Sequence, residues 1–552
     1  MNNTKDYEKY SKILLPFGIG IRIVFFIINL FVGGYNSDEV MTSLNAVSLA
    51  EKGTDIMGER LPVYFDTWVI GGQSPFATYL SALGIKLFGF NDFGVRIFAL
   101  VFSIIAFLAL YGFAKEVFKN SEYTAALTGL GCVCPWAVFS GAYVLDCNYL
   151  GHILIIALYF FARAINGDKT RFYILSMLFF ALGFYCYIAS VLFIPALLLT
   201  LYLVLLIKKR ISFKNAAISV ITVFVAALPF ILFGLVSSGI IKPFEFFGFS
   251  FSDMPGYERT SQTLFTYGNG PFIVNMFGNL FASLFFTVLS DSAYFALGVN
   301  VFSFGGILCG LLFLTGLIYL FFMLIKKNKG LDFNQKLFAL SFFTAFIFFA
   351  ATVSHSGFST MYRNYVFSYI ILYFSAIGYV QVRRHIKKAQ PKKALSIYLS
   401  LCFATFCFVY GGIYANQISP SEKGSRDLFL YGDSYYACLD YAKDNGYLWV
   451  KTYKTESSKY QPGVFLRHYY YDDIDYFNPL DKEFRDEIKD KTEDGAYKIK
   501  KDATQTYTYI KKGDTLSGEF CIVESREIKN LKISDEYEIK DFGFWSAVYK
   551  DI

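Results

Sequence analysis

Long apolar runs recur along the first three quarters of this chain, and they limit what it can fold into. Each run is about 17 to 25 residues long, the length that a helix needs to cross a hydrocarbon layer of roughly 30 Å. Of the 552 residues, 55% are hydrophobic and only 17% are charged, which is too apolar for an ordinary soluble enzyme of this length. The sequence therefore predicts a polytopic α-helical membrane protein.

About eleven spanning helices are predicted from these runs. They are expected at about 13–32, 94–114, 123–140, 148–165, 172–189, 191–207, 215–236, 300–325, 337–353, 364–382 and 394–414. The first run follows Lys5, Lys9 and Lys12 and lacks a small-residue cleavage site, so we expect an uncleaved first span and not a signal peptide.

Basic residues are distributed unevenly over the connections between the runs. They gather in alternate loops, such as "KEVFKN", "NGDKTR" and "KKRISFK", while the intervening "SGAYVLD" has none. Because basic loops stay in the cytoplasm, the N-terminus is expected there, and an odd number of crossings puts the C-terminus outside. Orientation and contact with anionic lipid account for the formal charge of +7, which does not indicate a nucleic-acid partner.

The composition changes near residue 416. Residues 1–415 are expected to form the transmembrane domain, and residues 416–552 a soluble extracytoplasmic α/β domain, where "GYLWVKTYK" alternates as a strand does. Within the first domain two outer loops are long, at 33–93 and 237–299, and loops of this size are rarely idle connectors. Cys438 and Cys521, in the polar tail, could pair with each other outside the cell.

An acid pair stands where the first apolar run gives way to polar sequence. Asp38 and Glu39 precede Val40, Leu44 and Val47, whose spacing predicts a short helix lying along the outer interface. The pair could simply cap that helix, since the helix dipole favours acids in a first turn. A carboxylate fixed at a helix start is also preorganised to accept a proton, so both interpretations stay open.

A second amphipathic helix is predicted ahead of the second span. Its apolar face consists of Phe76, Tyr79, Leu80, Leu83, Leu87 and Phe88. Together the two helices would form a docking platform for a substrate half buried in lipid. Gln73 and Tyr79 are the platform residues expected near donor or acceptor, with His355 from a later outer loop, although a lone His is commonly a satisfied polar group.

Asp146 lies in the short outer connection "SGAYVLDCNYLGH". It could be a solvated turn residue, but the topology puts it on the same face as Asp38, so the two carboxylates could converge on one cleft. Arg363 breaks the charge rule for an outer loop, and we expect it to bind a phosphate with help from Lys86 and Arg96. Lys86 and Arg96 could instead snorkel from the ends of spans.

No pattern indicates a metal or nucleotide site. "CVC" at 132–134 has neither the CxxC spacing nor a nearby His, and "FGIGI" at 17–21 lies inside an apolar run with no strand before it. A divalent cation is therefore neither indicated nor excluded as a cofactor.

Five segments in order carry a resemblance to a known family. They are "YNSDEV", "NAVSLAEKGTDIMGERLPVYF", "SPFATYLSALGIKLFGFNDFGVRIFA", "LDCN" and "FYCYIASVLFIP", within about the first 200 residues. This set resembles the membrane glycosyltransferases of the GT-C fold, more narrowly the bacterial branch of glycosyltransferase family 39, related to protein O-mannosyltransferases and the lipid A aminoarabinose transferase. The resemblance implies a polyprenyl-phosphate-linked sugar donor, with Asp38 as the catalytic carboxylate, Glu39 as its motif partner and Asp146 as the second acidic position.

Two positions depart from the pattern of the family. Relatives often have Lys where this chain has Gln73, and Ser-Arg before "LDCN" where this chain has "SGAY", with Gly141 in the Arg place. Both changes remove cations that could neutralise a lipid phosphate.

We therefore expect transfer of a sugar from a polyprenyl phosphate to an acceptor hydroxyl on the outer face, where no nucleotide sugars are present. Asp38 would take the proton of the attacking hydroxyl in a single inverting displacement, although a covalent intermediate is not excluded. The acceptor could be protein, lipid or cell-wall polymer. The alternative is a transporter or flippase of lipid-linked sugars, but such proteins usually have internal repeats and ionisable residues near midplane, and neither is evident here.

Overall fold

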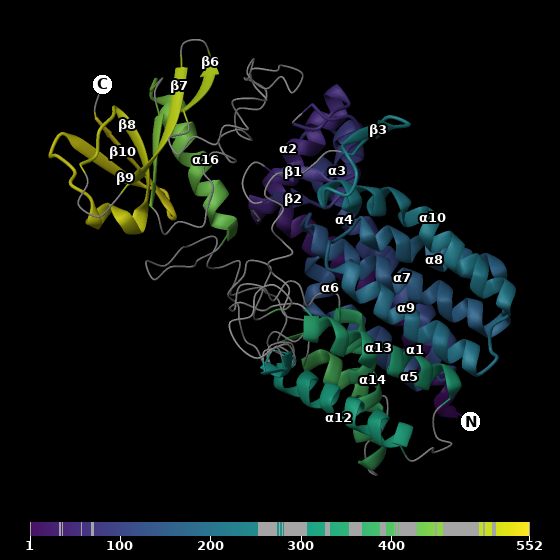
Figure 1. Cartoon of the computed structure of the whole chain (residues 1–552). Coiled ribbons are helices and arrows are strands. Elements are labelled where there is room, and N and C mark those ends of the chain that lie inside the picture. Colours follow the sequence, from purple (N-terminus) through teal and green to yellow (C-terminus); the bar gives the residue numbers. More distant parts are fainter. Residues whose placement is uncertain are drawn as a thin grey trace.

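A computed structural model gives the arrangement of the chain as a helical bundle with a small sheet beside it (Figure 1). The structure describes residues 2–32, 35, 37–56, 58–67, 71–251, 273–274, 276–278, 280, 306–325, 332–352, 367–386, 393–401, 403–404, 407, 428–447, 450–455, 496–500, 503–510 and 515–550.

The bundle is built from ten helices longer than twelve residues within these ranges, besides the helices of the first long loop. They are α1 (Asn2–Val32), α4 (Asp92–Phe118), α5 (Ser121–Val133), α7 (Asp146–Gly167), α8 (Thr170–Phe184), α9 (Ser190–Ile207), α10 (Phe213–Ser237), α12 (Gly306–Ile325), α13 (Phe333–Thr352) and α14 (Ser368–His385). In the described part of the chain, α1, α4, α7, α9 and α10 are long and apolar enough to cross a membrane, and shorter apolar helices lie in α8, α12 and α13. This agrees with the expected multi-pass membrane protein.

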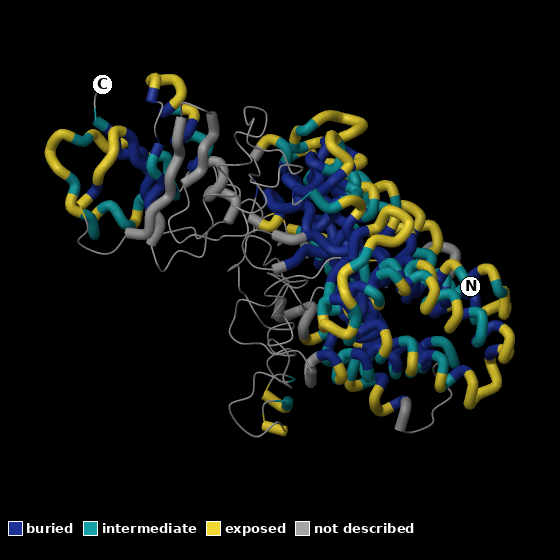
Figure 2. The backbone as a smooth tube through the Cα atoms, turned by 45° about the horizontal axis from the view of Figure 1, so that its top comes forward, coloured by how far each residue is buried: buried dark blue, intermediate teal, exposed yellow. Residues whose placement is uncertain are grey.

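Burial differs strongly among these helices. In the apolar window of α7, 67% of the residues are buried inside the protein, but only 28% of those of α10 are. Figure 2 shows the same contrast, with buried backbone in the interior of the bundle and exposed backbone on its rim. Because an apolar face exposed on a spanning helix contacts lipid, α7 is a central helix and α10 a peripheral one.

The helices α12 and α14 touch along their backbones. A Cβ atom on Gly316 would collide with the carbonyl of Phe374, and one on Gly378 with the carbonyl of Leu312. Small residues at such a crossing allow the close approach that is typical of helix pairs in membranes.

One expected helix is interrupted. The sequence predicts a continuous span over 123–140, but α5 ends at Val133 and a short helix, α6 (Pro135–Phe139), follows. Pro135 has no backbone N–H, so it cannot donate to the carbonyl of Gly131 one turn earlier. That carbonyl accepts a hydrogen bond from the Arg22 guanidinium instead, at 3.0 Å.

The first long loop contains α2 (Ser37–Lys52), β1 (Phe65–Thr67), β2 (Gly71–Gln73) and α3 (Pro75–Phe88). Contrary to expectation, α2 does not present an apolar face at the surface, because every residue from Val40 to Ser48 is buried against the rest of the protein. The second amphipathic helix fits its prediction better, since Leu83, Leu87 and Phe88 of α3 are exposed.

The C-terminal part forms a six-stranded sheet in the order β6-β7-β5-β8-β10-β9, covered by a helix that packs on β10 and β8. The elements are α16 (Leu428–Asp444), β5 (Val450–Thr455), β6 (Ala496–Lys500), β7 (Ala503–Ile510), β8 (Phe520–Glu524), the 3₁₀ helix η4 (Ser525–Asn530), β9 (Tyr537–Asp541) and β10 (Trp545–Lys550). The strand β5 is parallel to both of its neighbours, as the predicted α/β pattern requires. Cys438 and Cys521 are both buried free thiols, so the disulfide considered from the sequence is not formed.

Candidate active site

The two carboxylates of the acid pair lie in opposite environments. Glu39, in the first turn of α2, is fully buried, and both of its oxygens accept hydrogen bonds of 2.8 Å from Arg96 on α4. Arg96 is equally buried, and its guanidinium lies 4.6 Å from the ring centre of Tyr35 and 5.1 Å from that of Tyr143. A bidentate ion pair of this kind is both strong and geometrically specific. Burial raises the pKa of Glu39, and the Arg96 guanidinium acts in the opposite direction.

This ion pair also holds the segment that precedes α7. The Oε1 atom of Glu39 accepts the backbone N–H of Val144 at 2.9 Å, and the hydroxyl of Tyr143 donates to Oδ1 of Asn29 at 2.7 Å. The pair therefore joins the end of α1, the start of α2, α4 and the connection to α7. Glu39 is thus occupied by structural contacts.

Asp38 is placed differently, although it is the adjacent residue. Its side chain is exposed, while its backbone carbonyl accepts hydrogen bonds from the Thr42 hydroxyl at 2.9 Å and the Gln73 amide at 3.2 Å. The local backbone is thus held from two sides, and this exposed residue lies in the first turn of a helix, where the dipole stabilises the charged form of its carboxylate.

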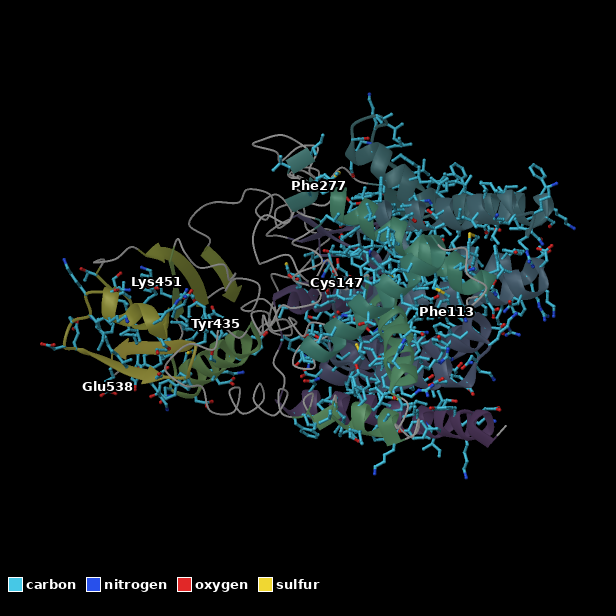
Figure 3. The ribbon with its side chains drawn as sticks, turned by 90° about the horizontal axis from the view of Figure 1, so that it is seen from below. Phe113, Cys147, Phe277, Tyr435, Lys451 and Glu538 are labelled. Atoms are coloured by element: carbon cyan, nitrogen blue, oxygen red, sulfur yellow. The ribbon has the colours of Figure 1, made fainter. Side chains whose placement is uncertain are left out.

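Asp146, the first residue of α7, lies near Asp38. Its Oδ1 atom accepts the N–H of Cys147 at 2.7 Å, and both Asp38 and Asp146 interact electrostatically with the Cys147 thiol. Cys147 lies toward one edge of the bundle, whereas Phe113 of α4 lies well inside it (Figure 3). The structure therefore places both acids in the surroundings of Cys147.

The start of α3 adds polar atoms to this neighbourhood. Gln73 also hydrogen-bonds to the Thr42 hydroxyl, and the N–H of Phe76 donates to the carbonyl of Tyr185 in the turn before α9 at 3.0 Å. Several buried polar atoms around these contacts have no hydrogen-bond partner within the structure as described: Gln73 Oε1, Ser74 Oγ, Thr78 Oγ1, the Tyr149 hydroxyl and Ser190 Oγ. Because buried polar atoms are rarely left unbonded, they are available to a polar ligand.

Of the four remaining predicted site residues, the structure describes two, both on α3. Lys86 is exposed in the last turn of α3, and Tyr79 is partly buried, with its hydroxyl bonded to the carbonyl of Pro62 at 2.9 Å. Arg363 and His355 lie outside the described residues. In the ranges that the structure describes, no group of three or more His, Cys, Asp or Glu side chains is arranged to hold a metal ion.

Gly141 has a steric reason to be glycine. A Cβ atom at this position would lie 2.7 Å from Cβ of Ser103, which is closer than side chains approach. A side chain as large as Arg has no room at this place, because Ser103 is itself fixed between Arg22 and the carbonyl of Ala137.

The sequence reasoning missed two residues that shape the site. Arg22 is fully buried in the middle of α1, and Tyr143 packs on Arg96. Arg22 carried a usable signal, since an ionisable residue inside a spanning run usually has a specific partner. Tyr143 carried none, because its role depends on the position of Asn29 in space.

Comparisons with known proteins agree on the fold. Residues 72–234 match the family model described as dolichyl-phosphate-mannose-protein mannosyltransferase, a segment that includes Gln73, Arg96 and Asp146. Among curated proteins, none matches the chain in sequence.

Two solved structures of ArnT from Cupriavidus metallidurans, one bound to undecaprenyl phosphate and one in the apo state, are similar with TM-scores of 0.54 and 0.53 at 10% identity. They cover 96% of this chain and 97% and 96% of their own. The archaeal oligosaccharyltransferase AglB from Archaeoglobus fulgidus, in complex with an inhibitory peptide and a dolichol-phosphate, has a TM-score of 0.46 at 12% identity, over 94% of this chain and 70% of its own. At these identities the ArnT structures show a shared fold.

Proposed function

For this membrane protein of the GT-C glycosyltransferase fold, we propose transfer of a sugar from a polyprenyl-phosphate-linked donor to an acceptor hydroxyl. The face on which this occurs is the one opposite the basic loops, where a lipid-carried sugar is the available donor. The resemblance of residues 72–234 to a mannosyltransferase family and the undecaprenyl phosphate bound to ArnT support this donor class.

One observation carries the choice of catalytic residue. Of the two adjacent acids, Glu39 is buried and engaged by Arg96, whereas the carboxylate of Asp38 is exposed on a backbone held by Thr42 and Gln73. A general base must reach the proton that it abstracts, and it must keep a fixed position while doing so. Asp38 meets both requirements, and we assign the positioning role to Glu39.

The chemical step follows from this assignment. Asp38 accepts the proton of the acceptor hydroxyl while the hydroxyl oxygen forms a bond to the anomeric carbon of the sugar. The bond from that carbon to the phosphate oxygen breaks, and the polyprenyl phosphate leaves with the bonding electron pair. A single displacement inverts the anomeric configuration and leaves a protonated Asp38, which then releases its proton to water.

The phosphate and the acceptor need separate partners. Arg96 is committed to Glu39, so of the cations expected from the sequence we propose Arg363 and the exposed Lys86 for the leaving phosphate. Asp146 shares the neighbourhood of Cys147 with Asp38, and we propose that it accepts a hydrogen bond from the acceptor and orients its hydroxyl.

The decisive experiment is transfer from a labelled polyprenyl-phosphate sugar by purified protein, comparing wild type with Asp38→Asn. Loss of the base should lower kcat by about 10²- to 10⁴-fold without lowering the melting temperature. Glu51→Gln is the matched control, because Glu51 is an exposed acid at the other end of the same helix. Full activity in folded Asp38→Asn protein would remove Asp38 from the mechanism.

The same preparations distinguish the alternative function. Wild-type protein that moves the labelled lipid between the two leaflets of a vesicle, but transfers no sugar, would identify a flippase.

A further inference from the structure

A short hairpin after α10 has an unusual surface. Its strands β3 (Phe244–Phe246) and β4 (Phe249–Phe251) pair in antiparallel register, with Phe244 opposite Phe251. The two turn residues, Phe247 and Gly248, have positive φ angles of 50° and 79°. Such two-residue turns match the twist of the strands, so the tip is sharply defined.

The tip of the hairpin is aromatic and exposed. Phe247 is 86% exposed, Phe246 56% and Phe249 41%. Three large apolar side chains at one point cost free energy in water, and a concentrated patch of this kind usually marks a contact surface.

The root of the hairpin is anchored in the protein. The rings of Phe244 and Phe251 stack with centroids 4.7 Å apart, and Phe251 is buried in a cluster with Val63, Tyr64 and Phe233. The exposed tip therefore projects from a fixed base.

Hydrogen bonds from one residue connect this root to the first long loop. The N–H of Ser250 donates to the carbonyl of Arg60 at 3.1 Å, its carbonyl accepts the N–H of Val63 at 3.5 Å, and its hydroxyl donates to the Glu59 carboxylate at 2.6 Å. The same loop continues through Tyr64, whose hydroxyl donates to the carbonyl of Gly72 at 3.3 Å, next to Gln73. The hairpin thus supports the segment that reaches Asp38.

The position of the tip relative to the bilayer follows from α10. This helix has 25 residues, about 37 Å of rise against a hydrocarbon layer of roughly 30 Å, so its far end reaches the headgroup layer. Its lipid-facing side carries Val220, Ile221, Phe224 and Val225, each at least 56% exposed. The basic cluster Lys208, Lys209 and Arg210 lies before its start, so the hairpin follows the end opposite that cluster.

We propose that the aromatic tip formed by Phe246, Phe247 and Phe249 inserts into the headgroup layer of the bilayer, so that its partner is a lipid surface. Toward and beyond the far end of α10, Leu228, Ile231 and Ile240 are exposed at 37%, 36% and 69%, and aromatic rings are enriched at this depth of membrane proteins. Lys242, exposed beside the hairpin, is placed to meet lipid phosphates. The insertion would hold the loop next to Asp38 at the depth of a lipid-borne donor, but the docking itself does not depend on the transferase activity proposed above.

The test is photo-crosslinking in proteoliposomes of phosphatidylethanolamine and phosphatidylglycerol, with p-benzoylphenylalanine in place of Phe247. Mass spectrometry of the irradiated protein should find phospholipid adducts on the hairpin peptide, in several-fold excess over those formed from the same amino acid in place of Ile539. Ile539 is the matched control because it is 49% exposed on β9 of the C-terminal sheet. A melting temperature equal to that of wild type confirms that each variant is folded.

Two results would overturn the proposal. A crosslink from position 247 to protein would identify a protein partner or a second copy of this chain. Adducts no more abundant than at position 539 would place the tip in water. In either case a sugar-transfer measurement on the wild-type protein still decides the proposed function, so the two can fail separately.

Discussion

The carboxylate of Glu39 and the guanidinium of Arg96 meet through two hydrogen bonds of 2.8 Å, and neither side chain has any exposed surface. These residues are separated by 57 positions in the chain, and their contact is the basis on which we propose Asp38, and not Glu39, as the general base. Glu39 is committed to Arg96, whereas Asp38 is the exposed residue of the pair.

Breaking the ion pair between Glu39 and Arg96 should mainly lower the stability of the folded protein. Glu39→Gln leaves the buried Arg96 guanidinium with only Asp92 as a carboxylate partner, at 3.5 Å and 40% exposed, and removing one partner of a buried pair costs about 3–5 kcal/mol. Thermal unfolding in detergent should show a clear fall in melting temperature for Glu39→Gln and for Arg96→Met. The control is Glu8→Gln, whose pair with Lys12 is exposed and should contribute about 0–1 kcal/mol. Equal melting temperatures for Glu39→Gln and Glu8→Gln would contradict the prediction.

Arg22 should stabilise the bundle through the break between α5 and α6. Its guanidinium donates to the carbonyls of Gly18 and Gly131 and to the Ser103 hydroxyl, at 2.9, 3.0 and 3.1 Å. Arg22→Met leaves the Gly131 carbonyl without a donor, because Pro135 one turn later has no N–H, and a buried acceptor without a donor costs about 1–3 kcal/mol.

Pro135→Ala provides the matching test, because an alanine N–H could donate to the Gly131 carbonyl that Arg22 now serves. A double-mutant cycle on the free energy of unfolding should therefore show that Arg22→Met lowers stability less in the Pro135→Ala background than in the wild type. The expected difference is at least ~0.5 kcal/mol. Strict additivity of the two substitutions would mean that the Gly131 carbonyl does not link them.

Position 141 should not accept a side chain. Because Cβ of an introduced residue would lie 2.7 Å from Cβ of Ser103, Gly141→Ala should destabilise the protein by about 1–3 kcal/mol, as overpacking does in cores. The control is Gly234→Ala, because Gly234 lies within α10 with open space around it. Gly239 also has open space, but its φ angle of +72° makes an alanine there strained. Unchanged thermal stability of Gly141→Ala would show that the Ser103 segment can move aside.

The two buried thiols of the C-terminal part, Cys438 on α16 and Cys521 on β8, should be reduced and slow to react. Burial raises the pKa of Cys521 to about 12 from an ordinary value of 9.0, so almost no thiolate is present at pH 8. Maleimide should label Cys521 slowly in folded protein and quickly in urea-unfolded protein, measured by mass spectrometry of the peptide that contains it, because Cys407 is exposed and reacts separately.

The raised pKa of Cys521 also makes the stability of the folded protein depend on pH. Since the pKa of Cys521 is higher in the folded state than in the unfolded state, its contribution to stability is fully present below about pH 9 and is lost as pH rises toward 12. Cys521→Ala should weaken the alkaline loss of stability in this range, measured by chemical unfolding at several pH values. An identical alkaline profile in the variant would assign that loss to other groups.

Much of the fold could be predicted from the sequence because it depends on local patterns. The length of an apolar run decides whether a helix can cross a bilayer, and the predicted spans correspond to α1, α4, α7, α8, α9 and α10 in the first half of the chain. The missing N–H of Pro135 made a break between α5 and α6 predictable in principle. The sequence could not show which other donor would bond to the Gly131 carbonyl that the break leaves open. That donor is Arg22, which is 109 residues away.

For the candidate site too, some features follow from the sequence and others only from the tertiary structure. The sequence by itself determined that an acid pair follows the first span, that Asp146 lies in the short connection before a later span and that basic loops alternate with neutral ones, because run length, residue type and order are local properties. Only the tertiary structure decided that Glu39 is buried on Arg96, that α2 lies inside the protein and that Gly141 packs on Ser103. The physical reason is that burial and ion pairing depend on which side chains meet across helices, and adjacent residues of one helix point in different directions.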